Sequence, residues 1–301
     1  MTNSHKICFS FVFNHRFEKN IPILREIYGD RFSTLRFLSP FSQWELEPDI
    51  IPIFETSVHF EGYFAQAYPH LPKDYDYYAF CADDLFLNPT INEENLIEKL
   101  NCTDSAYIKY LNPVWEHSFG WHKFAECINF PSDDCVVPYT QFLPSREELL
   151  ETYAQHGFSY RNVGSHNFLG TYHRGLTMRR VWEGTKYFLK NGLKRFVHFP
   201  LLEGYSDFII VPKESLEKFC FLCGVFAAMN LWVDSAIATA MTLSSHSLRL
   251  EKQNEMKGRE IWDEAALENL IKATDGKINR LSEQMPENQL YVHPVKLSMW
   301  S

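Results

Sequence analysis

Two adjacent acids, Asp83 and Asp84, follow a short apolar run from Tyr77 to Cys81. This run is aromatic and almost uncharged, which predicts a buried strand. Open α/β sheets bind their ligands at the carboxyl ends of such strands. Two carboxylates there repel each other unless a cation lies between them, so the pair predicts a site for a divalent metal. The alternative is a polar turn after a core strand, with Asp83 capping the next segment.

Other candidate groups also stand next to predicted strands and helices. Asn14, His15 and Arg16 follow the first apolar run, where a ligand would meet the sheet. Asp207 precedes another apolar run, and Asp234 opens an apolar helical segment. An acid among apolar neighbours is either a helix N-terminal charge stabilised by the helix dipole or a placed catalytic group.

The C-terminal run from Leu290 to Trp300 turns apolar again, so we expect it to pack on the body of the protein. It brings His293 and Lys296 with it. The alternative for His293 is an ordinary packed or surface histidine.

The elements that must position these groups alternate along the chain. Apolar periodicity predicts strands at 7–13, 35–38, 50–54, 77–81, 106–110 and 208–211. It predicts helices at 21–28, 60–68, 93–100, 145–155, 176–189, 213–229 and 233–243, and one or two surface helices over 251–280. Strands alternating with helices predict an α/β protein with a parallel or mixed sheet. No glycine-rich phosphate loop of the Rossmann or P-loop kind is present.

Composition excludes several classes of protein. The chain has 301 residues, 45% of them hydrophobic, which is typical of a folded globular protein. Its net charge of -9 argues against nonspecific nucleic-acid binding. Seven cysteines without framework spacing indicate free thiols in a reducing compartment. Cys220 and Cys223 fit a CxxC pattern, but their apolar surroundings favour core packing.

Membrane insertion is not expected. The longest apolar stretch, Phe219 to Trp232, is too short to cross a bilayer, and the N-terminus lacks the features of a secretory signal. We therefore expect a cytoplasmic location, while peripheral membrane association stays open.

The end of the fourth predicted strand carries a motif found in a known family. The sequence Phe80-Cys81-Ala82-Asp83-Asp84 resembles the acidic motif, often written Asp-x-Asp, of GT-A-fold glycosyltransferases. The resemblance implies that Asp83 and Asp84 hold Mn²⁺ or Mg²⁺ on the diphosphate of a nucleotide sugar. Cys81 stands where many members have their first Asp, and this departure weakens the ribose-contacting role of that position.

Later segments resemble further parts of the same family. The run from Gly204 to Asp207 resembles the start of the acceptor-side half, and Asp234 is placed like the catalytic base, with Asp207 as the second choice. The C-terminal His293 and Lys296 resemble the late residues that complete the metal shell and meet the diphosphate. Asn14, His15 and Arg16 are then expected to contact the nucleotide.

The resemblance implies one continuous domain with three regions: a nucleotide-sugar-binding half (1–111), an insertion or lid (112–200) and an acceptor half with a helical segment and a docked tail (201–301). The expected fold is GT-A-like (Rossmann-like), with a mixed, mostly parallel sheet flanked by helices and a helical insertion. The expected activity is transfer of a sugar from a nucleotide-diphosphate sugar, with UDP-sugar as first choice, to a hydroxyl of a carbohydrate or lipid-linked acceptor.

Elementary chemistry agrees with these roles. A divalent cation and a Lys stabilise the charge that develops on the departing diphosphate. A carboxylate can take the proton of the acceptor hydroxyl, and with Asp234 in that role the anomeric centre would invert. Two other classes stay open. A nucleotidyltransferase would usually show a Gly-rich loop after the first strand, which residues 13–17 lack. A noncatalytic carbohydrate-binding protein would keep the fold without the metal.

Overall fold

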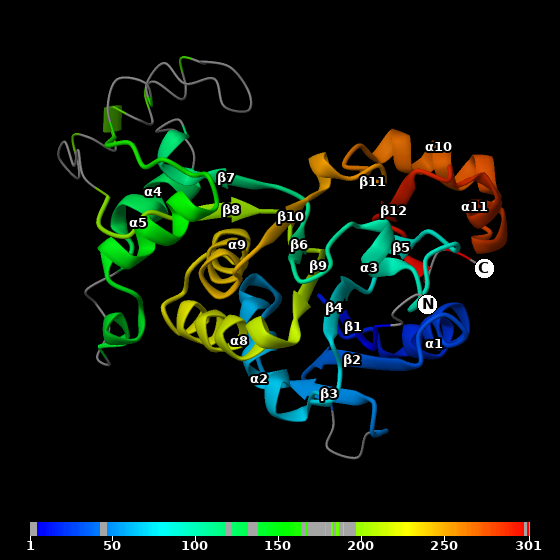
Figure 1. Ribbon diagram of the computed structural model, residues 1–301. Helices are drawn as coiled ribbons and strands as arrows, with labels where there is room; N and C mark the ends of the chain where they lie inside the picture. Colours follow the sequence, from blue (N-terminus) through cyan, green and yellow to red (C-terminus); the bar gives the residue numbers. More distant parts are fainter. Residues whose placement is uncertain are drawn as a thin grey trace.

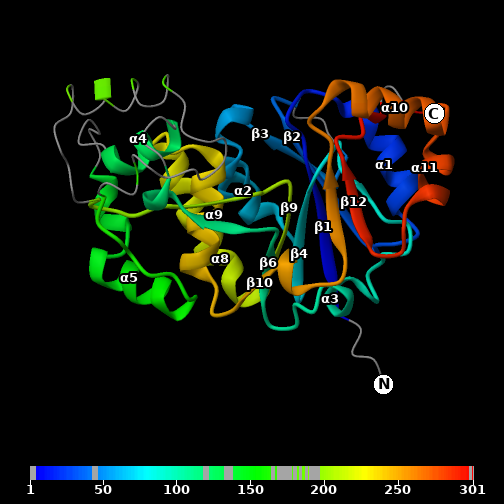
Figure 2. The same cartoon turned by 90° about the horizontal axis from the view of Figure 1, so that it is seen from above.

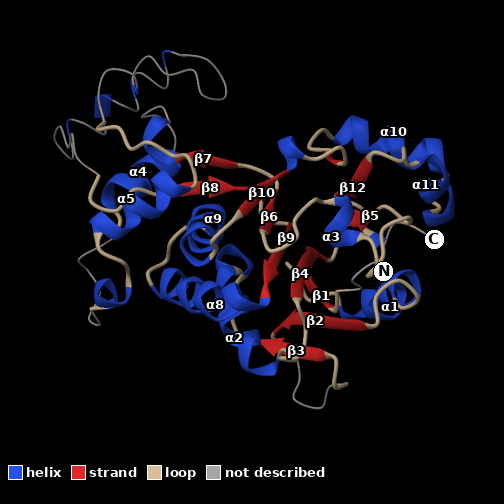
Figure 3. Ribbon diagram, viewed as in Figure 1, coloured by secondary structure: helices blue, strands red, loops and turns tan. Residues whose placement is uncertain are grey.

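A seven-stranded sheet forms the centre of the computed structural model (Figures 1 and 3). The structure describes residues 5–42, 47–117, 122–131, 138–163, 197–297 and 300, together with single positions between 167 and 189. In spatial order the strands are β10 (Leu248–Leu250), β6 (Ala106–Ile108), β9 (Phe208–Pro212), β4 (Tyr77–Ala82), β1 (Ile7–Val12), β2 (Thr34–Pro40) and β3 (Ile50–Ile53). Strands β4, β1, β2 and β3 run parallel, whereas β9 is antiparallel to both of its neighbours. The sheet is therefore mixed and mostly parallel, as predicted, and it is consistent with a GT-A-like fold.

Both faces of this sheet are covered, because side chains alternate along each strand. In β1, Cys8 and Val12 belong to the core on one face, and Phe9 and Phe11 to the core on the other. The first face packs against α2 (Glu61–Ala67), α8 (Lys213–Ala228) and α9 (Val233–Ser244). The second packs against α1 (Ile21–Tyr28), α3 (Leu96–Lys99), α10 (Glu264–Thr274) and α11 (Ile278–Gln284). Figure 2 shows these two groups of helices on opposite sides of the strands.

The chain changes direction at β1. From β1 it goes out to β2 and β3 on one side, and it then returns to β4 on the other side of β1. The carboxyl ends of β1 and β4 therefore flank a topological switch point, which is where open α/β sheets bind their ligands. The two ends are joined directly, since the Asp83 amide donates to the Val12 carbonyl at 3.1 Å.

A small second sheet docks the C-terminal segment. Strand β12 (Gln289–His293) lies between β11 (Lys257–Glu260), to which it is parallel, and β5 (Phe86–Leu87), to which it is antiparallel. Because β5 follows the Asp83-Asp84 pair in the sequence, this pairing brings the end of the chain to the tip of β4. The predicted docking of the tail is confirmed.

The region between β6 and β9 forms an excursion from the central sheet. It leaves along β7 (Leu111–Pro113) and returns along β8 (Leu202–Gly204), and these two strands pair antiparallel. Between them lie α4 (His122–Asn129) and α5 (Arg146–Gln155), and α5 begins at a capping box formed by Ser145 and Glu148. This is the region predicted as an insertion or lid. The predicted helix over 176–189 lies outside the described residues, apart from single positions.

Two predicted elements differ from the structure. The helix expected over 93–100 is reduced to the short α3, and the surface-helix region over 251–280 contains the strand β11 before α10 begins. Among the described residues, no helix combines the length and the apolar character that a bilayer crossing requires. Cys220 and Cys223 are buried in α8, as core packing predicts.

Candidate active site

A polar cavity of about 270 Å³ opens at the switch point between β1 and β4. Its lining consists of Asn14, His15, Phe17, Asn20, Asp83, Asp84 and Lys296. Five of these seven residues were singled out in the sequence, and they come from three separate segments of the chain. Neither Asp83 nor Asp84 forms an ion pair with Arg or Lys in the described part of the chain. Both carboxylates therefore line the cavity without an Arg or Lys partner in the described part of the chain, and Asp84 has His293 as its charged neighbour.

Asp83 is the more deeply buried member of the pair, with 7% of its surface exposed. Burial, followed by the charge of Asp84, raises its pKa to about 7. The backbone of Asn14 and the side chain of Asn20 act in the opposite direction, because they hydrogen-bond to the carboxylate. Asp83 is thus fixed to the loop that follows β1.

Asp84 faces the docked C-terminal strand. Its Oδ1 lies 3.0 Å from Nε2 of His293, and Nδ1 of the same imidazole lies 2.9 Å from the hydroxyl of Tyr205. Oδ2 of Asp207 lies 4.0 Å from His293 Nδ1. Burial lowers the pKa of His293, but the hydrogen bond to Asp84 and the charges of Asp84 and Asp207 outweigh it, so the net shift is upward. The imidazole of His293, at the end of β12, therefore contacts Asp84 at the tip of β4 and lies next to Tyr205 and Asp207, which precede β9.

Backbone contacts fix the segment that carries His293 and Lys296. The amide of Val295 donates to the Asp84 carbonyl at 2.5 Å. Upstream, the side chain of Asn88 donates to the Gln289 carbonyl at 2.7 Å. Lys296, one residue beyond Val295, is exposed and lines the cavity. Its ammonium is therefore available for an anion bound there.

Asp207 lies at the start of β9, and because β9 is antiparallel to β4 it stands at the same edge of the sheet as Asp83 and Asp84. The Ala82 amide donates to its carbonyl at 2.7 Å. Burial raises the pKa of Asp207 to about 6, while the charge of His293 acts to lower it. The sequence-predicted residue is thus close to the metal candidates and paired with His293.

Asp234 belongs to a separate polar cluster, on the excursion side of the molecule. Its Oδ2 accepts hydrogen bonds from the Lys123 ammonium and, at 3.2 Å, from the Trp232 indole. Lys123 also pairs at 3.1 Å with Glu203, which is buried and lies 3.4 Å from the His117 ring. The other oxygen of Asp234, Oδ1, has no hydrogen-bond partner among the described residues. The side chain is 36% exposed, so this oxygen can reach a ligand.

Arg16 does not line the cavity. It pairs with Glu18 at 3.0 Å, and 57% of its side chain is exposed. Its predicted contact with a nucleotide stays a prediction that would require the side chain to leave Glu18.

Several residues of the site carry no signal in the sequence. Asn20 and Tyr205 hold Asp83 and His293, and Lys123 holds Asp234. Trp262, which is 71% exposed, packs edge-on against His293 with ring centroids 5.5 Å apart. Such partners come together only through the tertiary fold, so neither spacing nor composition points to them.

The fit of a divalent metal depends on how many protein ligands converge. In the part of the chain that the structure describes, no group of three or more His, Cys, Asp or Glu side chains is arranged to hold an ion. Mg²⁺ usually keeps several waters and takes only one or two carboxylates together with substrate phosphates, and an imidazole suits Mn²⁺. The three predicted ligands, Asp83, Asp84 and His293, therefore do not form a complete cage among the described residues. Asp84 and His293 fit an ion that a bound diphosphate helps to hold, whereas Asp83 is hydrogen-bonded to Asn14 and Asn20.

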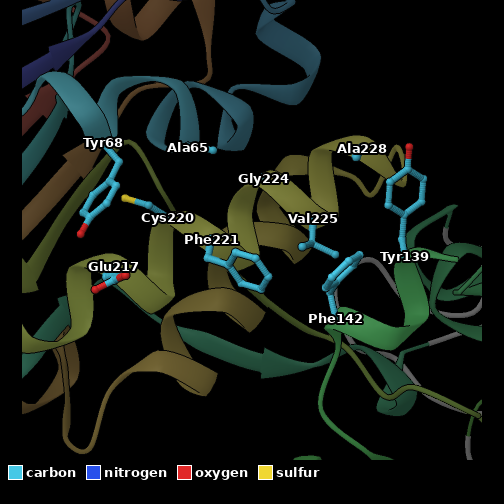
Figure 4. Close-up of a pocket in the computed structure, with 10 residues that line it drawn as sticks. All are labelled: Ala65, Tyr68, Tyr139, Phe142, Glu217, Cys220, Phe221, Gly224, Val225 and Ala228. Carbon is cyan, nitrogen blue, oxygen red and sulfur yellow. The ribbon is translucent and has the colours of Figure 1, made fainter. Parts of the chain in front are cut away.

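A larger groove of about 470 Å³ runs along α8. Figure 4 shows its mostly apolar lining, with Phe221 and Val225 of α8 facing Phe142. Glu217 is its one acidic side chain. Without convergent polar groups, this groove offers no proton or phosphate chemistry, and the smaller polar cavity is the candidate active site.

Comparisons with known proteins add little. No protein-family model matches the chain, and no curated protein matches its sequence. Among solved structures, the mannosyltransferase Ktr4p from S. cerevisiae is similar at 13% identity over 82% of this chain and 67% of that chain, with a TM-score of 0.39. The same protein in complex with GDP gives 13% identity over 82% and 68%, with a TM-score of 0.35. A likeness this distant assigns no activity to this chain.

Proposed function

We propose that the protein is a glycosyltransferase that moves a sugar from a nucleoside-diphosphate sugar to a hydroxyl acceptor. The observation that carries this proposal is the convergence of Asn14, His15, Asp83, Asp84 and Lys296 around one cavity at the switch point. Carboxylates, a lysine and strand-end polar groups are the side chains that bind a nucleotide, its phosphates and a cation. The regions 1–111 and 201–301 supply the two sides of this site.

In this proposal the predicted residues in and beside the cavity have distinct roles. Asn14 and His15 contact the nucleoside, beside the buried Asp83. Lys296 contacts the diphosphate, while Asp84 and His293 are the protein ligands of Mn²⁺ or Mg²⁺. When bound, the cation would stabilise the negative charge that develops on the leaving nucleoside diphosphate. Tyr205 and Asp207 orient His293 from its other nitrogen.

Asp234 is the proposed base. Lys123 and Trp232 hold Oδ2, which leaves Oδ1 free among the described residues to accept the proton of the attacking hydroxyl. With an acid in this role, the acceptor oxygen attacks the anomeric carbon as the carboxylate takes its proton, the bond to the diphosphate breaks, and the configuration inverts. Asp207 is the second choice, because its contact with His293 favours a positioning role.

Calorimetric titration with UDP and with GDP, each with and without Mn²⁺, tests the proposal. We expect the protein to bind one of the two nucleotides, and we expect this binding to require Mn²⁺. We also expect Asp84→Asn to lose at least tenfold in affinity, because one carboxylate ligand is gone; losses of about 10–100-fold are usual even for residues that only support metal ligands. The control is Asp74→Asn, an exposed acid before the amino end of β4, which should bind like the wild type.

Other results would contradict the proposal. Absence of any nucleotide uptake favours a noncatalytic carbohydrate-binding protein. Exchange of pyrophosphate into a nucleoside triphosphate favours a nucleotidyltransferase. Equal binding by wild type and Asp84→Asn places the metal elsewhere.

A further inference from the structure

We propose that a second cavity, between α3 and the start of β11, binds an uncharged saccharide and does so without nucleotide or metal. The cavity has a volume of about 700 Å³, within the range of roughly 300–1,000 Å³ that is usual for small-molecule sites. Its described lining residues all differ from those of the cavity at the switch point. The inference therefore goes beyond the proposed function and does not depend on it.

The second cavity lies at the opposite end of β12 from His293. In the pairing of β11 with β12, Lys257 stands opposite Gln289 at the start, and Glu260 stands opposite His293 at the end. Residues that come just before these two starts, Met256 and Asn288 among them, line the cavity. The strand from Gln289 to His293 spans about 13 Å, at about 3.3 Å per residue. The cavity is thus a separate site and not an extension of the candidate active site.

Uncharged amides form much of the lining. The Asn and Gln side chains in it are Asn95, Asn101, Gln253, Asn254 and Asn288. Each carboxamide can both donate and accept hydrogen bonds, as sugar hydroxyls also can. Met256 is the one apolar residue of the described lining, which contains no aromatic ring on which a nucleobase could stack. The lining therefore suits a ligand that is rich in hydroxyl groups.

Asn254 is the buried member of this set. It is 9% exposed, and neither its Oδ1 nor its Nδ2 has a hydrogen-bond partner among the described residues. Its backbone is fixed, because its amide donates to the Glu251 carbonyl at 2.9 Å. A buried carboxamide without partners is unfavourable. Two adjacent sugar hydroxyls would supply the missing acceptor and the missing donor together.

Backbone contacts hold the walls of the cavity in place. Nε of Arg249 donates to the Asn101 carbonyl at 2.8 Å and joins β10 to the turn after α3. The Lys257 amide donates to the Asn288 carbonyl at 2.9 Å and joins β11 to the turn before β12. These bonds use the carbonyl groups of Asn101 and Asn288 and leave their side-chain amides for a ligand. Walls that are ordered beforehand lose little freedom on binding, which favours affinity.

The charged groups at the cavity balance one another. The acids in the lining or next to it in the chain are Glu94, Glu98, Glu255 and Glu287. The bases in the lining, next to it in the chain or bonded to it are Lys99, Lys252, Lys257 and Arg249. Beneath them, Glu251 lies 3.9 Å from the ammonium of Lys109. Among the described residues, no three of the acids are arranged to hold an ion. A neutral ligand is therefore favoured over a cation or an anion.

Calorimetric titration of the metal-free protein, in EDTA and without nucleotide, tests the site. The probes are cellobiose, maltose, lactose, α-1,2-mannobiose and N,N′-diacetylchitobiose, with spermidine and inorganic phosphate as charged counterparts. We expect at least one disaccharide to bind with saturation, and neither charged probe to bind as tightly. The affinity for that disaccharide should be the same when Mn²⁺ and nucleotide replace the EDTA.

Variants test the role of the amides. Asn254→Leu keeps the side-chain volume and removes both polar atoms, so the disaccharide should bind about tenfold more weakly, while the melting temperature is unchanged or raised. Asn101→Ala and Asn288→Ala remove exposed amides and should each weaken binding by about twofold to tenfold. The control Asn279→Ala removes an exposed amide on α11 and should bind like the wild type.

Four results would overturn the inference. The first is the absence of saturable binding by every disaccharide. The second is tighter binding of spermidine or phosphate, and the third is disaccharide binding that appears only with nucleotide and Mn²⁺, which would belong to the candidate active site. The fourth is wild-type affinity in a folded Asn254→Leu variant or in both alanine variants of the lining. None of these results bears on the proposed function, which the nucleotide titrations test separately.

Discussion

The carboxyl group of Glu61, in the first turn of α2, is fully buried. Its Oε1 lies 3.3 Å from the His59 ring, and its Oε2 has no hydrogen-bond partner among the described residues. Burial raises its pKa to about 9, and the charges of Glu55, Glu126 and Asp234 add to the shift. At neutral pH this carboxyl group is therefore protonated in the folded protein and ionised in the unfolded chain.

This difference makes stability depend on pH. Between about pH 4.5 and 9 the folded state holds a proton that the unfolded state releases, so the free energy of unfolding falls as pH rises, by at most about 1.4 kcal/mol per pH unit. Glu61→Gln cannot ionise and should flatten this part of the curve. Urea unfolding at pH 5, 7 and 8.5 measures it, with the exposed Glu94→Gln as control. Parallel curves for wild type and Glu61→Gln would contradict the prediction.

At the scale of single residues, the sequence locates part of the site. Asn14, His15, Asp83 and Asp84 are predictable because polar residues directly after buried strands must lie at the sheet edge. The pairing of Asp234 with Lys123 is not, since the two are 111 residues apart and no local pattern links them.

At the scale of elements, β11 and β12 pack against each other at a glycine. A side-chain carbon at Gly258 would overlap the ring of Tyr291, whose hydroxyl donates to Glu260 at 2.6 Å. Glycine is required here by the close approach of the ring, and β12 carries His293 to Asp84.

Gly258→Ala should therefore displace the Tyr291 ring and strain β12. We expect it to lower the free energy of unfolding by about 1–3 kcal/mol, the usual cost of overpacking. It should also weaken nucleotide binding, because His293 and Lys296 follow the displaced strand. Urea unfolding and calorimetry check both effects. The neighbouring exposed Arg259→Ala should stay within about 0.5 kcal/mol of the wild type, and an equal effect of the two variants would refute the role of the glycine.

Local signals predict some elements better than others. The apolar spacing over residues 21–28 gives the bounds of α1, Ile21–Tyr28, because a helix needs only near neighbours. The helix predicted over 93–100 is shortened at its start because the Asn92 side chain accepts from the Glu94 and Asn95 amides and holds them in a turn. Strand β11 was missed because its sequence, Lys-Gly-Arg-Glu, becomes a strand only through its pairing with β12.

At the scale of the whole molecule, the small number of protein ligands for a metal predicts that Mn²⁺ stabilises the fold mainly when a nucleotide is bound as well. Mn²⁺ alone should raise the melting temperature little, because Asp84 and His293 cannot complete its coordination. Mn²⁺ with the correct nucleotide should raise it by several degrees, since a ligand at 100 times its Kd adds about 2.7 kcal/mol. Thermal scans with EDTA, Mn²⁺, nucleotide and both together measure this. A full shift with Mn²⁺ alone would instead indicate a complete protein cage.

The ladder of β7 and β8 has a consequence for how this protein can diversify. Pro113 and Leu202 lie opposite each other in its register, so the points where the chain enters and leaves the excursion are adjacent. A segment inserted between two such neighbours can lengthen, shrink or be exchanged without stretching the central strands. Asp207 lies directly downstream, just before β9, so changes within the excursion leave the strands that carry the candidate site in place.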